Sequence, residues 1–106
     1  MTAANETDIV DVPSESRFVH REGDALAELD YELRGDRFFL LHTEVPEQLE
    51  GQGLGGRLVR SALARARREQ LTIVPWCPFA RRWLKEHRDE AGEVSIDFTT
   101  KPPAVN

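Results

Sequence analysis

The sequence predicts a single α/β (α+β) domain with a mostly antiparallel sheet, one β-α-β crossover and two main helices. Two patterns predict this fold class. Apolar residues alternate with polar ones in the first half of the chain, as in strands, and take a helical spacing from about residue 54. A length of 106 residues suits one domain with a modest core. The composition, 40% hydrophobic and 31% charged, is that of an ordinary globular protein.

Three strands are expected before Pro46. The first covers residues 17–21, and the second covers residues 25–33, in which every other residue is apolar. The turn sequence Arg-Gly-Asp-Arg at residues 34–37 then returns the chain into a third strand over residues 37–45. Pro46 ends that strand because proline has no N–H to donate to a ladder.

Two helices and two short strands are expected after the third strand. Residues 71–74 are predicted to form a short buried strand, and Pro78 suits the first turn of a second helix that Gly92 ends. The alternation in residues 94–98 predicts a last strand, so the expected order is β-β-β-α-β-α-β. The first helix is predicted from apolar residues at helical spacing, which are Leu54, Leu58, Val59, Ala62, Leu63 and Ala66.

The domain is expected to span residues 17–100 between two tails. Residues 1–16 are polar and acidic, which predicts a flexible tail with a short strand around residues 9–12. Residues 101–106 contain two prolines and form the second expected tail. The single cysteine, Cys77, cannot form an intramolecular disulfide, which fits a reducing compartment. Because neither a signal peptide nor a bilayer-spanning apolar run is visible, we expect a cytoplasmic protein without membrane partners.

The net charge of −5 is unevenly distributed along the chain. Residues 54–70 carry five arginines and one glutamate, a charge of +4, so the remainder carries −9. An acidic protein with one basic segment is a poor general binder of nucleic acid. The distribution instead favours local recognition of an anion.

A glycine-rich segment, Glu-Gly-Gln-Gly-Leu-Gly-Gly at residues 50–56, stands directly before the first predicted helix. Four glycines in six positions indicate a backbone that approaches a ligand closely rather than a core. The start of the helix adds unpaired amides and the positive end of its dipole. The segment therefore predicts a site for a phosphate-bearing ligand.

Two familiar phosphate loops fit this segment poorly. A Walker-A loop needs Gly-Lys-Ser/Thr, whereas Gly56 is followed by Arg57 and Leu58. The dinucleotide fingerprint matches at Gly51, Gly53 and Gly56. However, the next strand ends without the acidic residue that would hold a ribose, and the chain is too short for a doubly wound sheet.

Three segments in order resemble the Gcn5-related N-acetyltransferases (GNAT), and within them a small single-domain subfamily of YjdJ type. The segments are His42-Thr43-Glu44-Val45-Pro46, residues 50–55, and Pro75-Trp76-Cys77-Pro78-Phe79, and the resemblance runs from about residue 31 to residue 87. It implies a reduced acyl-CoA N-acyltransferase fold and transfer of an acetyl group from acetyl-CoA to an amine. One position departs from the family pattern, because most members have Gln or Arg where this chain has Glu50.

The resemblance also implies where acetyl-CoA would bind, as a co-substrate without a metal. The loop amides would bind the pyrophosphate, and the backbone near Val45 would pair with the pantetheine arm. Arg57 and Arg60 could meet a phosphate of CoA. The implied cofactor-binding residues are Val45, Gly51, Gln52, Gly53, Leu54, Gly55, Gly56 and Arg57. The other helix arginines, Arg65, Arg67 and Arg68, are expected on a solvated face.

Cys77 and His42 are the predicted catalytic residues. Many family members use a tyrosine on the second helix to protonate CoA, and no tyrosine follows Tyr31 here. Cys77, at the positive end of that helix, could donate this proton or take the acetyl group covalently. His42 could act as a base, with Glu44 on the same side as a weaker alternative. Structural roles stay open for both: a small buried thiol, and a polar residue on the other side of the strand.

Two other functions stay open from the sequence. The first is an acyl-CoA binding or sensing module without turnover, which the missing tyrosine favours. The second is a protein-interaction domain in which the glycine loop is merely a turn. No metal is expected, because His20 and His87 lack partners at metal-ligand spacing. The acceptor could be a small molecule or a protein amine, and the sequence indicates no oligomeric state.

Overall fold

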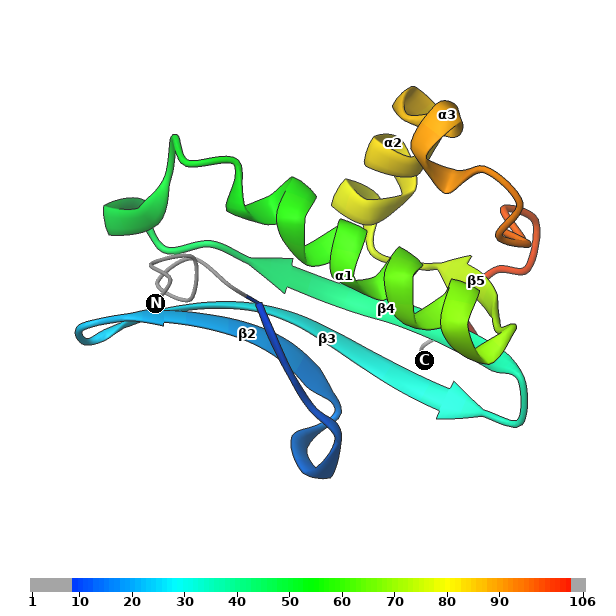
Figure 1. Ribbon diagram of the computed structural model, residues 1–106, viewed down its shortest axis with the longest axis horizontal. Coiled ribbons are helices and arrows are strands. Elements are labelled where there is room, and N and C mark those ends of the chain that lie inside the picture. Colours follow the sequence, from blue (N-terminus) through cyan, green and yellow to red (C-terminus); the bar gives the residue numbers. More distant parts are fainter. Residues whose placement is uncertain (1–8, 104–106) are drawn as a thin grey trace.

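The computed structural model describes residues 9–103 and contains a sheet with helices on one side (Figure 1). The elements are β1 (Val10–Val12), the 3-10 helix η2 (Pro13–Glu15), β2 (Arg17–Glu22), β3 (Ala25–Arg34), β4 (Arg37–Glu44), the 3-10 helix η3 (Glu47–Leu49), α1 (Leu54–Glu69), β5 (Thr72–Pro75), α2 (Pro78–Glu86) and α3 (Arg88–Ala91).

The sheet has the order β1-β2-β3-β4-β5. The first four strands pair antiparallel, and β4 and β5 pair in parallel through the crossover helix α1. The three helices lie on the same side of the sheet in Figure 1. The predicted mixed α/β fold, with its mostly antiparallel sheet and β-α-β crossover, is therefore confirmed.

The core lies between α1 and the sheet. All six apolar residues that predicted the first helix are buried, which confirms the helical spacing as a burial pattern. They meet strand residues that are fully buried, among them Leu29, Phe38 and Leu40. No described helix is long and apolar enough to cross a bilayer.

The predicted last strand over residues 94–98 is wrong. Only a single parallel bridge forms there, between Ile73 and Ile96. Ile73 donates its N–H to the carbonyl of Ser95 and accepts the N–H of Asp97. Beyond this bridge, the carboxylate of Asp97 accepts the backbone N–H groups of Thr99 and Thr100, which turns the chain away from β5. The alternating residues therefore form one bridge beside β5, and the side chain of Asp97 holds the backbone donors that would extend the pairing.

The second helix is also shorter than the position of Gly92 suggested. It ends at Glu86, because His87 leaves the helical conformation with φ −125° and ψ 47°. The separate turn α3 follows and ends at Gly92. At the other end of the chain, the short strand expected around residues 9–12 is present as β1. Residues 1–8 and 104–106 of the two predicted tails lie outside the described part of the chain.

Candidate functional site

The parallel strands β4 and β5 separate halfway along β4. Their ladder ends at the pair Leu40 and Pro75, whereas β4 continues to Glu44. The backbone N–H groups of Trp76 and Cys77 both donate to the carbonyl of Leu40, at 3.0 and 2.8 Å. These two bonds close the ladder and lead the chain into α2. The edge of β4 beyond Leu40 therefore faces a gap instead of a neighbouring strand.

A β-bulge at Leu41 decides which side chains face this gap. Tyr31 lies opposite Leu40 and Asp30 lies opposite His42, so Leu41 is an extra residue in β4. The bulge reverses the alternation, and Thr43, opposite the buried Leu29, lies on the helix side of the sheet.

His42 and Glu44 lie on the other face of the sheet. Their side chains are 59% and 64% exposed, and Nε2 of His42 is 3.4 Å from Oε1 of Glu44. The two residues thus share one side, as the alternation indicated. The structure does not bring His42 to Cys77.

Cys77 lies at the N-cap of α2 and is 2% exposed. Its Sγ is 3.2 Å from Oγ1 of Thr43, and either atom can be the donor. Its carbonyl accepts the N–H of Arg81 at 2.9 Å, in the first turn of α2. The contact partner of the predicted thiol is therefore Thr43, which the sequence patterns did not single out.

The glycine-rich loop reaches α1 through two left-handed residues. Gly51 has φ +88° and Gly53, the N-cap of α1, has φ +71°, with open space around both. The carbonyl of Gly53 accepts the N–H of Arg57 at 3.1 Å, the first helical bond. The N–H groups of residues 54–56 precede that bond, so they have no carbonyl partner within the helix. They are available to an anion at the positive end of the dipole.

A pocket of about 370 Å³ lies between the edge of β4 and the first turns of α1 and α2. Leu49 and Phe79 contribute apolar walls, and Thr43 contributes a hydroxyl. Six of the eight predicted cofactor-binding residues line it; Gln52 and Arg57 do not. The lining consists of Thr43, Val45, Leu49, Glu50, Gly51, Gly53, Leu54, Gly55, Gly56 and Phe79.

The other two glycines of the motif have a packing role, which corrects the expectation that none of them serves a core. A Cβ at Gly55 would be 2.7 Å from Cζ of Phe79, and a Cβ at Gly56 would be 2.7 Å from Nε1 of Trp83. Both distances are too short for real contacts. Gly55 and Gly56 therefore let the start of α1 approach α2 closely.

The helix arginines do not all lie on a solvated face. Arg65 is the clearest correction: its side chain is only 12% exposed and donates to Asp11 at 3.0 Å and to the hydroxyl of Tyr31 at 2.9 Å. Arg60 holds Glu90 through bonds of 2.6 and 3.0 Å, and this hydrogen bonding lowers the pKa of Glu90. Arg57 lies beside Arg60 at a separate hollow of about 450 Å³.

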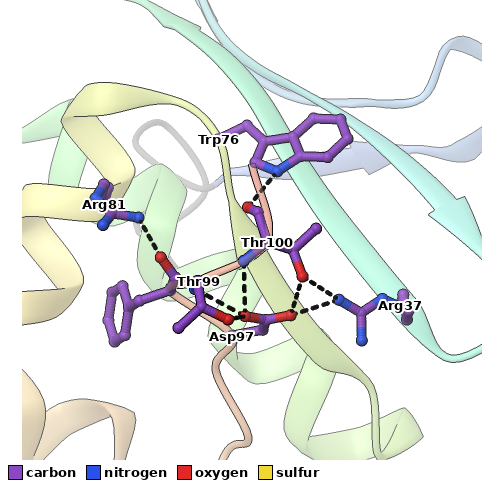
Figure 2. A network of polar contacts seen from close by, with 7 residues as sticks. Arg37, Trp76, Arg81, Asp97, Thr99 and Thr100 are labelled. Atoms are coloured by element: carbon purple, nitrogen blue, oxygen red, sulfur yellow. Dashed lines mark hydrogen bonds and ion pairs between the residues drawn. The ribbon is translucent and has the colours of Figure 1, made fainter. Parts of the chain in front are cut away.

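The segment formed by residues 97–100 braces the junction of β5 and α2 (Figure 2). Trp76 donates its indole N–H to the carbonyl of Thr100 at 2.9 Å, and Arg81 donates to the carbonyl of Phe98 at 2.8 Å. Asp97 accepts from Arg37 of β4 at 2.6 Å. Because Cys77 follows Trp76 directly, these bonds hold in place the backbone segment that carries the thiol. No group of three potential metal ligands occurs within residues 9–103.

A family model described as GCN5-related N-acetyl-transferase matches residues 17–94. The chain belongs to this family. The family resemblance of the sequence motifs is thus confirmed, and the smaller YjdJ-type subfamily stays a prediction.

A solved structure agrees with the family match. This GNAT chain is similar to an NMR solution structure from Staphylococcus aureus, described as a "GCN5-like putative N-acetyltransferase", with 27% identity and a TM-score of 0.67. The similarity covers 89% of this chain and 94% of the other. No functionally curated protein matches the sequence.

Proposed function

We propose that this GNAT protein transfers an acetyl group from acetyl-CoA to a primary amine. One observation carries the proposal: the pocket combines helix-start amides, a strand edge that leaves its neighbour, and an apolar wall. Acetyl-CoA carries a diphosphate, an amide-bearing arm and a thioester in this order. The helix-start amides suit the diphosphate, the strand edge suits the arm, and the apolar wall suits the thioester. The amine can be a small molecule or a side chain of a protein.

Each part of acetyl-CoA has a proposed partner. The amides of Leu54, Gly55 and Gly56 would bind the pyrophosphate, favoured by the helix dipole. The edge of β4 beyond Leu40, together with Val45 directly after the strand, would pair with the amides of the pantetheine arm, as an added strand does. The thioester would then lie at the Thr43 end of the pocket, and Arg57 stays a candidate partner for an outlying phosphate.

The transfer requires a neutral amine and a protonated leaving group. The amine nitrogen attacks the thioester carbonyl carbon, the C–N bond forms and the C–S bond breaks. CoA leaves as a thiolate that takes one proton, and the amine loses one. His42 is proposed as the base for an amine that approaches on its face of β4. Cys77 is proposed to serve the leaving thiolate, since burial of its sulfur behind Thr43 favours proton donation over covalent acetylation.

Binding is tested by calorimetry with acetyl-CoA on two matched glycine variants. Gly53 and Gly35 both have positive φ and open surroundings, but only Gly53 lines the pocket. We expect wild type and Gly35→Ala to bind acetyl-CoA, and Gly53→Ala to bind at least tenfold more weakly. An absence of binding heat for the wild type at millimolar acetyl-CoA would sink the proposal.

An acyl-CoA binding module without turnover is the second candidate. It is favoured because Tyr31, the single tyrosine of the chain, is held by Asp11 and Arg65 and does not line the pocket. Such a module binds acetyl-CoA but releases no CoA when amines are added. Thiol detection of free CoA with spermidine and with a lysine-containing peptide separates the two functions.

A further inference from the structure

We propose that Thr43 is a catalytic residue that gives its hydroxyl proton to the CoA sulfur, and that Cys77 acts through it. The inference rests on the proposed acetyl transfer, which produces the thiolate that needs a proton. Its basis is the 3.2 Å contact between Oγ1 of Thr43 and Sγ of Cys77. Thr43 lines the pocket, whereas Cys77 is 2% exposed and lies outside the described lining. The hydroxyl therefore stands between the thiol and the ligand.

The bulge at Leu41 is what brings Thr43 to this place. With strict alternation from the buried Leu40, His42 would point toward the helices and Thr43 would point away from them. The extra residue exchanges the two, so that the hydroxyl faces the pocket and the imidazole faces the open side of the sheet. Bulges commonly redirect a side chain next to an active site.

The thiol is fixed relative to the same strand. The N–H of Cys77 donates to the carbonyl of Leu40, one residue before the bulge, and its Sγ contacts Thr43, two residues after it. The carbonyl of Cys77 is held by the N–H of Arg81. Both members of the pair are thus positioned by β4 itself, so the contact needs no rearrangement when a ligand arrives.

A threonine hydroxyl can donate one hydrogen bond while it accepts another, which a proton relay requires. As the C–S bond of the thioester breaks, the CoA sulfur takes the proton of Thr43, and the threonine oxygen takes the proton of Cys77. The negative charge moves from CoA to the Cys77 sulfur, and no alkoxide is left behind. The proton that the attacking amine releases restores the thiol through solvent, so protons and charges balance.

Hydroxylamine is a suitable acceptor for the test, because it is small, neutral near pH 7 and needs no dedicated amine site. CoA release is followed with acetyl-CoA as donor and corrected for the rate without protein. We expect Thr43→Val to lower kcat by about 100-fold or more, in the range of general acid catalysis, with the KM for acetyl-CoA changed less than about twofold. Thr43→Ser, which keeps the hydroxyl, should recover most of the rate, which excludes misfolding as the cause. Cys77→Ala should resemble Thr43→Val, and the double variant should be no slower than either.

The contact itself can be read without turnover. Since the chain has one cysteine, its S–H stretching band in the infrared is a single signal, and we expect Thr43→Val to shift it. If Thr43→Val releases CoA at the wild-type rate, the relay is overturned but the proposed acetyl transfer is not. An acetyl group found on Cys77 after mixing with acetyl-CoA would overturn it in favour of covalent transfer. A wild type that binds acetyl-CoA but releases no CoA with hydroxylamine or any amine would overturn both the relay and the proposed transfer.

Discussion

Arg37 and Asp97 are 60 residues apart in the chain and are joined by an ion pair of 2.6 Å between Nη2 and Oδ2. The same carboxylate accepts the hydroxyl of Thr100 at 2.6 Å and both the N–H and the hydroxyl of Thr99 at 2.8 Å. The bond from Thr100, then the one from Arg37, lowers the pKa of Asp97 below its usual value. Asp97 is therefore the anchor of the segment that braces the β5–α2 junction.

The first prediction is that Asp97→Asn destabilises the fold at neutral pH. Because the pKa of Asp97 in the folded protein is below the ordinary value of 3.8, the contribution of Asp97 to stability is fully present above about pH 4. The contribution is lost as the pH falls further through the folded value. Urea unfolding should show a constant gap between wild type and variant from pH 7 to pH 5, and a shrinking gap below about pH 4. The matched control is Asp24→Asn in the exposed turn between β2 and β3, which should leave the midpoint nearly unchanged.

The second prediction concerns Tyr31, whose hydroxyl donates to Asp11 at 2.6 Å and accepts from the partly buried Arg65. Burial, and then the bond to Asp11, raises the pKa of Tyr31 from 10.0 to about 12. A raised pKa means that the unfolded chain loses its proton first, so stability should fall as the pH rises from about 10 to about 12. Phenolate absorbance reports this directly, because Tyr31 is the single tyrosine. A native titration midpoint near 10 would contradict it.

The third prediction is that Arg65→Lys destabilises the fold, because Arg65 donates to Tyr31 and Glu69 in the same cluster. The ammonium of lysine cannot reproduce the planar fork that reaches both Tyr31 and Glu69. We expect a loss of about 1–3 kcal/mol in the free energy of unfolding, typical of a buried polar group left without its partner. Arg68→Lys, on the exposed part of α1, should change it by less than about 0.5 kcal/mol.

The strands and helices were predictable because the spacing of apolar residues within each element depends only on which of its faces is buried. The period of two in β3 and the helical spacing in α1 each follow from one buried face, whatever lies on it. Arg65 shows where this reasoning ends. Its charge indicated a solvated position, but its partner Asp11 lies 54 residues away in the chain, and only the folded arrangement brings them together.

The candidate site was half predictable for the same reason. Val45 and the glycine loop could be predicted as a candidate site from the glycine pattern and the family resemblance, and most of these residues line the pocket. Thr43 could not, because its direction depends on the register between β3 and β4, and one extra residue at Leu41 reverses it. A bulge leaves no mark in the alternation of polar and apolar residues when the following positions are all polar. Without the bulge, alternation from Leu40 would turn His42 toward the helix side of the sheet, where the structure has Thr43 in contact with Cys77.

The fourth prediction concerns Glu50, which lines the pocket beside the amides proposed for the pyrophosphate. A carboxylate at this position would lie close to the bound diphosphate, and the two negative charges would repel each other. Glu50→Gln is therefore expected to tighten acetyl-CoA binding by about two- to fivefold at low salt, and the gain should diminish at high salt. Glu47→Gln in η3 removes the same charge outside the pocket lining and serves as the control. Equal effects of the two variants in calorimetry would show that Glu50 acts only through the net charge.

The fifth prediction is that Gly56→Ala destabilises the fold although alanine is the better helix former. The new Cβ would be 2.7 Å from Nε1 of Trp83. The Trp83 ring cannot easily move, because it stacks on the His87 ring with 3.9 Å between the ring centroids and the guanidinium of Arg60 lies over it. Overpacking costs about 1–3 kcal/mol, and the gain in helix propensity is only about 1 kcal/mol. We expect a net loss of up to about 2 kcal/mol, together with weaker acetyl-CoA binding, because the start of α1 must move away from α2.

Trp83→Phe provides the test of this cause, because a phenyl ring lacks the Nε1 atom that the new methyl group would meet. In the double variant, Gly56→Ala should cost markedly less than it does in the wild-type background. Thermal unfolding of the four proteins measures the coupling, and each kcal/mol corresponds to a shift of about 4–8 °C in Tm for a domain of this size. If the stability losses of Gly56→Ala and Trp83→Phe simply add in the double variant, the contact between Gly56 and Trp83 does not limit the packing of α1 on α2.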